Sequence, residues 1–382
     1  MSLPPTSVNG GAGVNEFWVD TGSNTLFGPV ALHGPPGSNS FIIYDDQANA
    51  AAQTYTLTTN TVSRSGAASV TFDNLNQVIL YAASVGGNTI NVPSLAAGVL
   101  DNLGAANGDT VTIGSNQTVA AVLGQVAVGP YDNTSATVVI DDSGNPTPLA
   151  SLITLSNSPP YGYLISGLIP SGIYLGAGQN TTLNTSLLTG AGNKTFNVQA
   201  APQGVALTLN AGSGTNTLDY TGFAGNVLVD LPLGAATGFS GISNIYNVRG
   251  ASGGPAGSYN ILVGNGGNVL TGGNGRRNVL IAGATASTLN GGDGEDILIA
   301  GTTAYDTNEA SLRAIAAYWA GPDGTATRIA NLLSGNGVPL LDATTVNGNG
   351  GGNTVNGGLD LLFANADLDT LSYDPLSTLI RI

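Results

Sequence analysis

The sequence predicts an all-β fold: an elongated, mostly parallel β-solenoid of the β-helix or β-roll type, with a short helical pair near the C-terminus. Two observations support this. Short strand-forming pairs recur at a nearly fixed step, and glycine-rich turns fill the intervals between them. So short a period suits neither helices nor ordinary hairpins. It suits strands that each stack on the equivalent strand one coil away.

The clearest repeats lie in residues 264–301. A small polar residue precedes each strand-forming pair there, and these residues are spaced by 10, 9 and 9 positions: Asn268, Asn278, Ser287 and Asp296. The pairs that follow them are Val269-Leu270, Val279-Leu280, Thr288-Leu289 and Ile297-Leu298. The positions equivalent to Asp296 in the neighbouring repeats are therefore expected to be Asn268, Asn278 and Ser287.

A related sequence pattern recurs over most of the chain. A glycine turn leads to Asn or Asp, a small residue and an apolar strand, as in GSNSFIIY (37–44), GGNTINV (86–92), NGDTVTI (107–113), GAGNKTFNV (190–198) and GGNTVNGG (351–358). Gly and Asn tolerate the positive φ angles of tight corners. Thr, Val, Ile and Leu favour the strands between them.

Longer repeats suggest an organisation in modules. FIIYDD (41–46) resembles TVVIDD (137–142), 96 residues later. We therefore expect an N-terminal segment (1–19), two β modules (20–124 and 125–210), a solenoid with the short repeats (211–301), a helical insertion or cap (302–335) and C-terminal strands (336–382).

The apolar period changes after residue 301. Leu312, Ile315, Ala316 and Trp319 recur at helical spacing. Asp306 and Glu309 resemble a capping box that starts this helix, and Gly321-Pro322 ends it. A shorter helix is expected over 325–333. An open side or end of a solenoid exposes core and strand edges, so we expect the helical pair to cover a side or an end, with Trp319 buried beneath it. The alternative is that the helices bind a partner.

Composition limits the partners of the chain. The net charge is −15, with 8 basic residues, and only 8% of residues are charged. Such a chain cannot neutralise a run of phosphates, which argues against nucleic-acid binding and against anionic membranes. It has no stretch of about 18 apolar residues, so no membrane insertion is expected. Cysteine is absent, which excludes disulfides and thiolate metal sites.

The N-terminus lacks the basic and apolar regions of a signal peptide. We therefore expect either a segment of a larger exported protein or a mature or recombinant chain.

One motif suggests metal binding. Residues 291–299, GGDGEDILI, fit the calcium-binding nonapeptide G-G-x-G-x-D-x-U-x at every fixed position. The glycine turn lets backbone carbonyls point inward, and the carboxylate completes an oxygen cage for a hard cation. The predicted metal residues are Gly291, Asp293 and Asp296, with Ca²⁺ as the cofactor. In the alternative, a metal-free roll, the Asn, Ser and Thr side chains form hydrogen-bonded ladders.

Residues 264–301 resemble hemolysin-type, RTX-like calcium-binding repeats. The resemblance extends over 216–250, 297–319 and 328–346 to the C-terminal region of giant secreted or surface-attached bacterial repeat proteins. It implies an extracellular or cell-surface β-solenoid with a structural or adhesive role. Asn268, Asn278 and Ser287 depart from the family's aspartate positions, so the resemblance implies calcium loading only at the last repeat.

Enzymatic interpretations find little support in the sequence. The single histidine, His33, lies in a turn, so a catalytic triad would have to be built on it. The adjacent pairs Asp45-Asp46 and Asp141-Asp142 are the nearest candidates for paired acids. Adjacent strand residues point to opposite faces, however, so turn chemistry is expected to explain both pairs.

We therefore expect a non-enzymatic extracellular structural protein: a surface fibre, matrix or adhesin segment that self-associates through solenoid ends or edge strands. The alternative is a β-helix that binds or cleaves carbohydrate, which would make surface glycans its partners. It requires an aromatic-lined groove with at least two convergent carboxylates. A third hypothesis is a calcium-responsive secretion or folding module.

Overall fold

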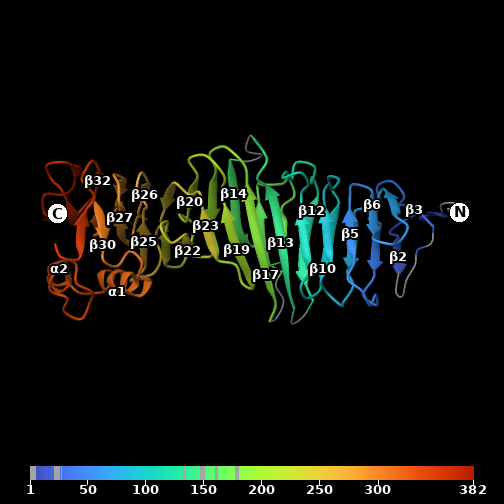
Figure 1. Cartoon of the computed structure of the whole chain (residues 1–382), viewed down its shortest axis with the longest axis horizontal. Helices are drawn as coiled ribbons and strands as arrows, with labels where there is room; N and C mark the ends of the chain where they lie inside the picture. Colours follow the sequence, from blue (N-terminus) through green and yellow to red (C-terminus); the bar gives the residue numbers. More distant parts are fainter. Residues whose placement is uncertain are drawn as a thin grey trace. The chain divides into compact units, whose positions relative to one another are not determined.

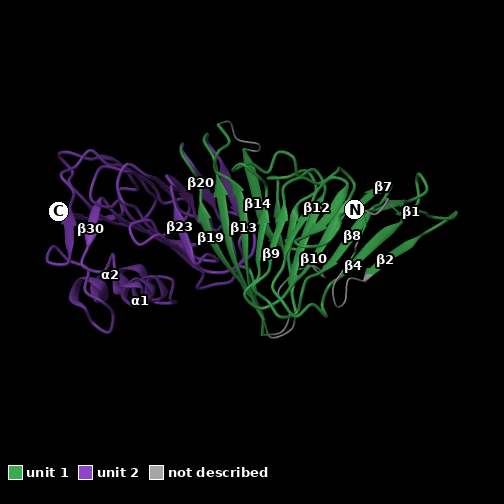
Figure 2. Ribbon diagram, turned by 45° about the vertical axis from the view of Figure 1, so that its right-hand side comes forward, with its two compact units in different colours: residues 1–192, 202–213 green, residues 193–201, 214–382 purple. Residues whose placement is uncertain are grey.

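The computed structural model describes residues 6–20, 26, 28–131, 134–146, 151–159, 162–176 and 180–382. The first five residues of the expected N-terminal segment therefore lie outside the described part. The chain divides into two compact units, Met1–Gly192 with Pro202–Ser213, and Asn193–Ala201 with Gly214–Ile382 (Figure 2). Strands dominate both units, and most neighbouring strands are parallel (Figure 1). The predicted all-β solenoid with a C-terminal helical pair is confirmed.

One sheet of the first unit has the strand order β1-β3-β7-β6-β5-β9-β11-β13-β17-β19. Its strands are β1 (Thr6–Asn9), β3 (Val30–His33), β5 (Thr54–Leu57), β6 (Thr61–Arg64), β7 (Val70–Asp73), β9 (Thr89–Val92), β11 (Thr110–Ile113), β13 (Ser135–Asp142), β17 (Thr182–Thr189) and β19 (Val205–Asn210). Only β6 runs against its neighbours, β5 and β7, among the described strands of this sheet.

The other sheet of the first unit has the order β2-β4-β8-β10-β12-β16-β15-β14. Its strands are β2 (Glu16–Asp20), β4 (Phe41–Asp45), β8 (Gln77–Tyr81), β10 (Leu100–Ala105), β12 (Gln125–Pro130), β14 (Leu152–Asn157), β15 (Tyr163–Ser166) and β16 (Ile173–Leu175). Here β15 is antiparallel to both β14 and β16. Buried and exposed side chains alternate along most strands of this unit, as expected for a sheet with one face toward the core.

The second unit also stacks its strands in parallel. One row has the order β18-β20-β24-β26-β28-β32-β34: β18 (Thr195–Val198), β20 (Thr217–Asp219), β24 (Asn247–Arg249), β26 (Val269–Thr271), β28 (Thr288–Asn290), β32 (Thr354–Asn356) and β34 (Thr370–Ser372). The other has the order β22-β21-β25-β27-β29-β33-β35: β21 (Val227–Asp230), β22 (Ala235–Ala236), β25 (Tyr259–Val263), β27 (Arg277–Ile281), β29 (Ile297–Ile299), β33 (Leu361–Ala364) and β35 (Thr378–Arg381). The remaining strands are β23 (Gly241–Ser243) and the antiparallel pair β30 (Gly301–Thr303) and β31 (Val346–Gly348).

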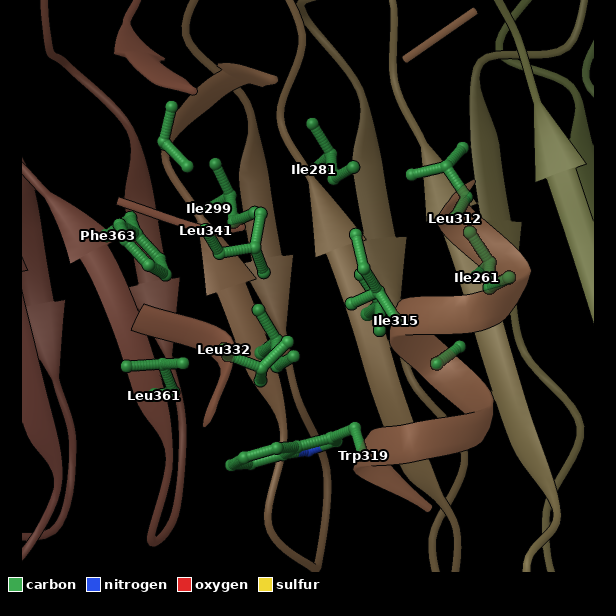
Figure 3. Close-up of a cluster of buried hydrophobic side chains, with 14 of the residues drawn as sticks. Ile261, Ile281, Ile299, Leu312, Ile315, Trp319, Leu332, Leu341, Leu361 and Phe363 are labelled. Atoms are coloured by element: carbon green, nitrogen blue, oxygen red, sulfur yellow. The ribbon is translucent and has the colours of Figure 1, made fainter. Parts of the chain in front are cut away.

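Two helices cover one side of the second row. Helix α1 spans Glu309–Trp319 and helix α2 spans Thr325–Ser334. Their apolar side chains pack on the strand residues Ile261, Ile281, Ile299, Leu361 and Phe363, as Figure 3 shows. Strands β25, β27, β29 and β33 are therefore buried on both faces, which explains why their sequences are continuous apolar runs without alternation.

The predicted helix face is confirmed, but its predicted start is wrong. Leu312, Ile315, Ala316 and Trp319 are the buried residues of α1. The N-cap is Asn308, whose side chain accepts a hydrogen bond from the backbone N–H of Ser311, whereas Asp306 bonds instead to Thr303. The Asp306 carboxylate thus stabilises the turn before the helix and does not cap the helix. Neither helix, nor any other helical segment in the described ranges, is long and apolar enough to span a membrane.

Candidate functional site

The calcium-motif turn between β28 and β29 separates the predicted metal residues. Gly292 and Gly294 have φ angles of 95° and 136°, a conformation that glycine adopts readily. Asp293 is exposed, whereas Asp296 is fully buried. A Cβ at Gly291 would lie 2.7 Å from Asp296 Oδ2, so Gly291 keeps the turn close to that carboxylate. Gly291 and Asp296 are thus brought together, and Asp293 faces solvent.

Asp296 belongs to a polar ladder inside the second unit, formed by Asn260, Asn278, Asp296 and Asp360. Asn260 Nδ2 donates to Asn278 Oδ1 over 2.7 Å, and Asn278 donates to Asp296 Oδ1 from its backbone N–H (2.7 Å) and from Nδ2 (2.8 Å). Asp296 N–H then donates to Asp360 Oδ1 over 2.8 Å. All four residues are at most 2% exposed. The ladder thus joins four coils through side chains as well as backbone. Asn278 lies next to Asp296 as predicted, but Asn268 and Ser287 are not equivalent to Asp296, because they precede β26 and β28 in the other row of strands and bond to each other there.

The ladder ends in two adjacent carboxyl groups, one of which the sequence analysis missed. The second Oδ atoms of Asp296 and Asp360 are both buried, and neither has a hydrogen-bond partner among the described residues. Burial, followed by the charge of Asp360, raises the pKa of Asp296 well above its usual value. Burial also raises the pKa of Asp360 to about 6. The pair therefore favours a bound proton or a cation.

This donor set fits a hard cation only in part. Asp296 and Asp360 supply two carboxylate oxygens without partners, whereas calcium takes six to eight oxygen ligands. The carbonyl of Gly291 already accepts a hydrogen bond from Asn278 Nδ2 over 2.9 Å. The described residues contain no group of three or more His, Cys, Asp or Glu side chains suited to a metal ion. Backbone carbonyls or water would have to complete any calcium shell.

A cavity of about 690 Å³ lies between this turn and the end of α1. Its charged lining residues are Arg276, Arg277, Asp293 and Glu295. Arg276 donates to four backbone carbonyls, those of Gly253, Gly225, Phe223 and Ala224. Arg277 donates to the carbonyls of Trp319 and Gly321 and pairs with Glu295 over 2.8 Å. Both guanidinium groups are thus committed to contacts within the protein.

Glu295 anchors the helical pair to the solenoid. Its carboxylate accepts hydrogen bonds from Thr325 and Arg328 of α2, and its carbonyl accepts one from Trp319 Nε1 over 2.7 Å. Arg328 is 1% exposed, lies 4.6 Å from the Trp319 ring centroid and donates to the Trp319 carbonyl. Burial alone would raise the pKa of Glu295, but the bonds from Thr325 and Arg328 and the charge of Arg328 outweigh it and lower the pKa.

Both predicted acid pairs have one buried member. Asp46 accepts hydrogen bonds from Tyr55 (2.5 Å) and Arg64 (3.3 Å) in the interior, while Asp45 accepts one from the backbone of Gln47. Asp142 is buried, and Asp141 accepts hydrogen bonds from the backbone and hydroxyl groups of Ser143. The two carboxylates of a pair therefore do not converge.

His33 is the last residue of strand β3, and not part of a turn as predicted, and it has a carboxylate partner on the surface. Its Nδ1 lies 2.8 Å from Asp73 Oδ2, with the two side chains 39% and 54% exposed. Its in-register neighbour on β1 is Asn9. The in-register residues Asn9, His33 and Asp73 thus supply an amide, an imidazole and a carboxylate. A catalytic triad would need a nucleophile such as serine in place of Asn9.

An unexpected carboxyl group is buried in the first unit. Asp101 on β10 is 1% exposed and lies in register between Val78 and Val126, in a row that is otherwise apolar. Neither of its oxygens has a hydrogen-bond partner in the described part of the chain. Burial raises the pKa of the Asp101 carboxyl to about 8. No other side chain in this row offers the groups needed for catalysis.

Comparison with protein-family models, with curated proteins and with solved structures finds no match to this chain.

Proposed function

We propose that this chain is a non-enzymatic, extracellular or cell-surface structural protein: a segment of a surface fibre, matrix or adhesin. The observation that supports the proposal is that the buried polar side chains of the second unit bond to other parts of the protein. The Asn and Asp side chains of the ladder join successive coils, and Arg276, Arg277 and Glu295 hold loops and helices to the solenoid. These groups stabilise the scaffold, and in the part of the chain that the structure describes they do not converge as a catalytic set in a groove.

The proposed mode of assembly is self-association through edge strands. Strands β34 and β35 each pair with one neighbour in the described part of the chain, namely β32 and β33. Their apolar side chains Leu371, Leu379 and Ile380 are only partly buried. Edge strands of this kind accept a further strand by β-augmentation. The chain contains one lysine, Lys194, so lysine side chains do not guard these edges.

Sedimentation velocity over a range of protein concentrations tests this mode of assembly. The wild-type chain is expected to form larger species as the concentration rises. Thr370→Lys places a charge on the edge strand β34 and should shift the distribution toward the monomer. Asn102→Lys on the exposed face of β10 is the matched control and should leave assembly unchanged. Self-association through these edges is refuted if the wild-type chain stays monomeric at the highest concentration, or if both variants assemble as it does.

We also propose that a calcium ion acts as a local addition at the RTX-like turn, held by the predicted ligand Asp296 together with Asp360. The other two predicted residues are less suited, because Asp293 is exposed and the Gly291 carbonyl already accepts a hydrogen bond. The support is the pair of partnerless buried oxygens on Asp296 and Asp360. A cation between them would offset the repulsion of two ionised carboxylates. The ion would then join the coil before the helical segment to the coil after it.

Carbohydrate binding is the second candidate, favoured by one observation. Trp18 is 58% exposed and lines a cavity of about 390 Å³ together with Phe17 and Glu16. Glu16 is the single carboxylate among the described lining residues, so the cavity suits stacking of a sugar ring better than cleavage. Because Trp319 is buried, a fluorescence change on titration with oligosaccharides would report on Trp18. This candidate predicts that Trp18→Ala abolishes that change.

A further inference from the structure

A second kind of polar array lies on the outer face of the first unit. Strands β5, β9, β11, β13, β17 and β19 are consecutive and parallel, and their outward residues are in register. We call these residues the hydroxyl grid. One row is Thr54, Thr89, Thr110, Thr137, Asn184 and Ala206, and the other is Thr56, Asn91, Thr112, Val139, Ser186 and Thr208.

The hydroxyl grid contains few types of residue, and most of them are polar and uncharged. Ten of its twelve residues carry a hydroxyl or amide group, and seven are threonine. None is charged and none is aromatic. Every grid residue is exposed or partly exposed, whereas the residues between the two rows are at most 2% exposed. None of the seven threonine hydroxyls has a hydrogen-bond partner among the described residues, so all seven are available to water.

The geometry of the hydroxyl grid is periodic in two directions. Neighbouring strands lie about 4.8 Å apart, and alternate residues along a strand lie about 6.7 Å apart. Each threonine adds an apolar methyl group beside its hydroxyl. Such a surface offers hydroxyl groups as anchors for water at fixed lateral intervals, with methyl groups between them. The water oxygens on a face of crystalline ice repeat at comparable intervals.

We propose that the hydroxyl grid binds ice. Three features select this partner. A periodic surface is complementary to a periodic solid rather than to a single soluble molecule. The lack of charge leaves no ion whose hydration shell would disrupt an ordered water layer. The lack of aromatic side chains disfavours a crystalline polysaccharide, whose sugar rings stack on such groups. This activity is independent of the proposed structural role and does not rest on it.

The test uses the full chain in a nanolitre osmometer, with ice-affinity purification as a second measurement. The wild-type chain is expected to shape growing ice crystals, separate the freezing and melting points, and concentrate in the ice fraction. Thr112→Tyr places bulk in the middle of the hydroxyl grid, between Asn91 and Val139 in register, and should remove most of this activity. Thr112→Ser, which keeps the hydroxyl and removes the methyl group, should retain an intermediate activity.

Asn102→Tyr is the matched control, because it adds the same bulk to an exposed position on the other sheet of the same unit. It should leave ice activity unchanged, and circular dichroism would confirm that all variants fold. The proposal is overturned if the wild-type chain has no effect on ice growth. It is also overturned if Thr112→Tyr and Asn102→Tyr behave alike, or if the chain adsorbs to crystalline cellulose or chitin but not to ice.

Discussion

The backbone N–H of Asp296 donates a 2.8 Å hydrogen bond to Oδ1 of Asp360, although 64 residues separate them in sequence. The two strands that follow these residues, β29 and β33, are neighbours, and both helices lie in the chain segment between them. The solenoid therefore resumes its register after the helical segment. The Asp296–Asp360 hydrogen bond joins the coil before the helical segment to the coil after it.

Asp360→Ala should destabilise the second unit, because it removes the acceptor of a buried N–H group. The expected loss in the free energy of unfolding is about 1–3 kcal/mol. Asp360→Asn keeps the acceptor and removes the like charge, so it should match or exceed wild-type stability at pH 7. Urea titration followed by circular dichroism distinguishes them. Equal stability of the two variants would show that the contact contributes nothing.

Calcium should raise the melting temperature of the wild-type chain at pH 7 and have no effect on Asp360→Asn. The reason is that the cation offsets the repulsion between Asp296 and Asp360, which the amide removes. Differential scanning calorimetry with calcium or a chelator measures both. If calcium raises the melting temperature of wild type and variant equally, the ion binds elsewhere. If calcium changes neither melting temperature, the ladder binds no calcium.

Asp101 should make the chain less stable as the pH rises. The folded-state pKa is raised to about 8, so the stability present below the unfolded pKa of about 4 is lost as the pH approaches 8. Asp101→Val matches its in-register neighbours Val78 and Val126, and its gain in the free energy of unfolding should be larger at pH 8 than at pH 4 by roughly 3 kcal/mol or more. The measurement is the midpoint of urea unfolding at each pH.

Asp367 provides the control for this pH dependence, because its side chain is 82% exposed. Asp367→Asn should leave the pH profile of the wild-type chain unchanged. A gain for Asp101→Val that is the same at pH 4 and pH 8 would mean that packing, and not ionisation, accounts for it.

Arg328→Met should loosen the helical pair, since it leaves Glu295 without its most buried cation. Removing one partner of such a pair costs about 3–5 kcal/mol. Hydrogen exchange should show faster exchange in α1 and α2, with the strands of the first unit unchanged. Arg313→Met breaks the exposed ion pair with Glu309 and should cost less than about 1 kcal/mol. Comparable losses in the two variants would contradict the anchoring role of Arg328.

The fold was predictable because its signals are local. Glycine and asparagine corners and short apolar strands indicate a solenoid, and the helical spacing of Leu312, Ile315 and Trp319 identified the buried face of α1. The position of the helices on β25, β27, β29 and β33 was not predicted. Its signal was present in the non-alternating runs 261–263, 279–281, 297–299 and 361–363, which indicate strands covered on both faces.

The candidate site was less predictable because it depends on contacts distant in sequence. NGGLDLLFA (356–364) parallels NGGDGEDILIA (290–300) with a turn two residues shorter, so motif spacing alone hides the equivalence of Asp360 and Asp296. The anchoring of Glu295 by Arg328 joins residues 33 positions apart, without a local pattern. Asp101 lies within the strand sequence LDNLGA, where alternation places it inward, but nothing local shows that it lacks a partner.

Electron microscopy of the purified chain at high concentration tests the structural role most directly. The proposed function predicts unbranched filaments or end-to-end oligomers of the wild-type chain, which Thr370→Lys shortens or abolishes. Single, separate particles of one chain at every concentration, with and without calcium, would contradict it.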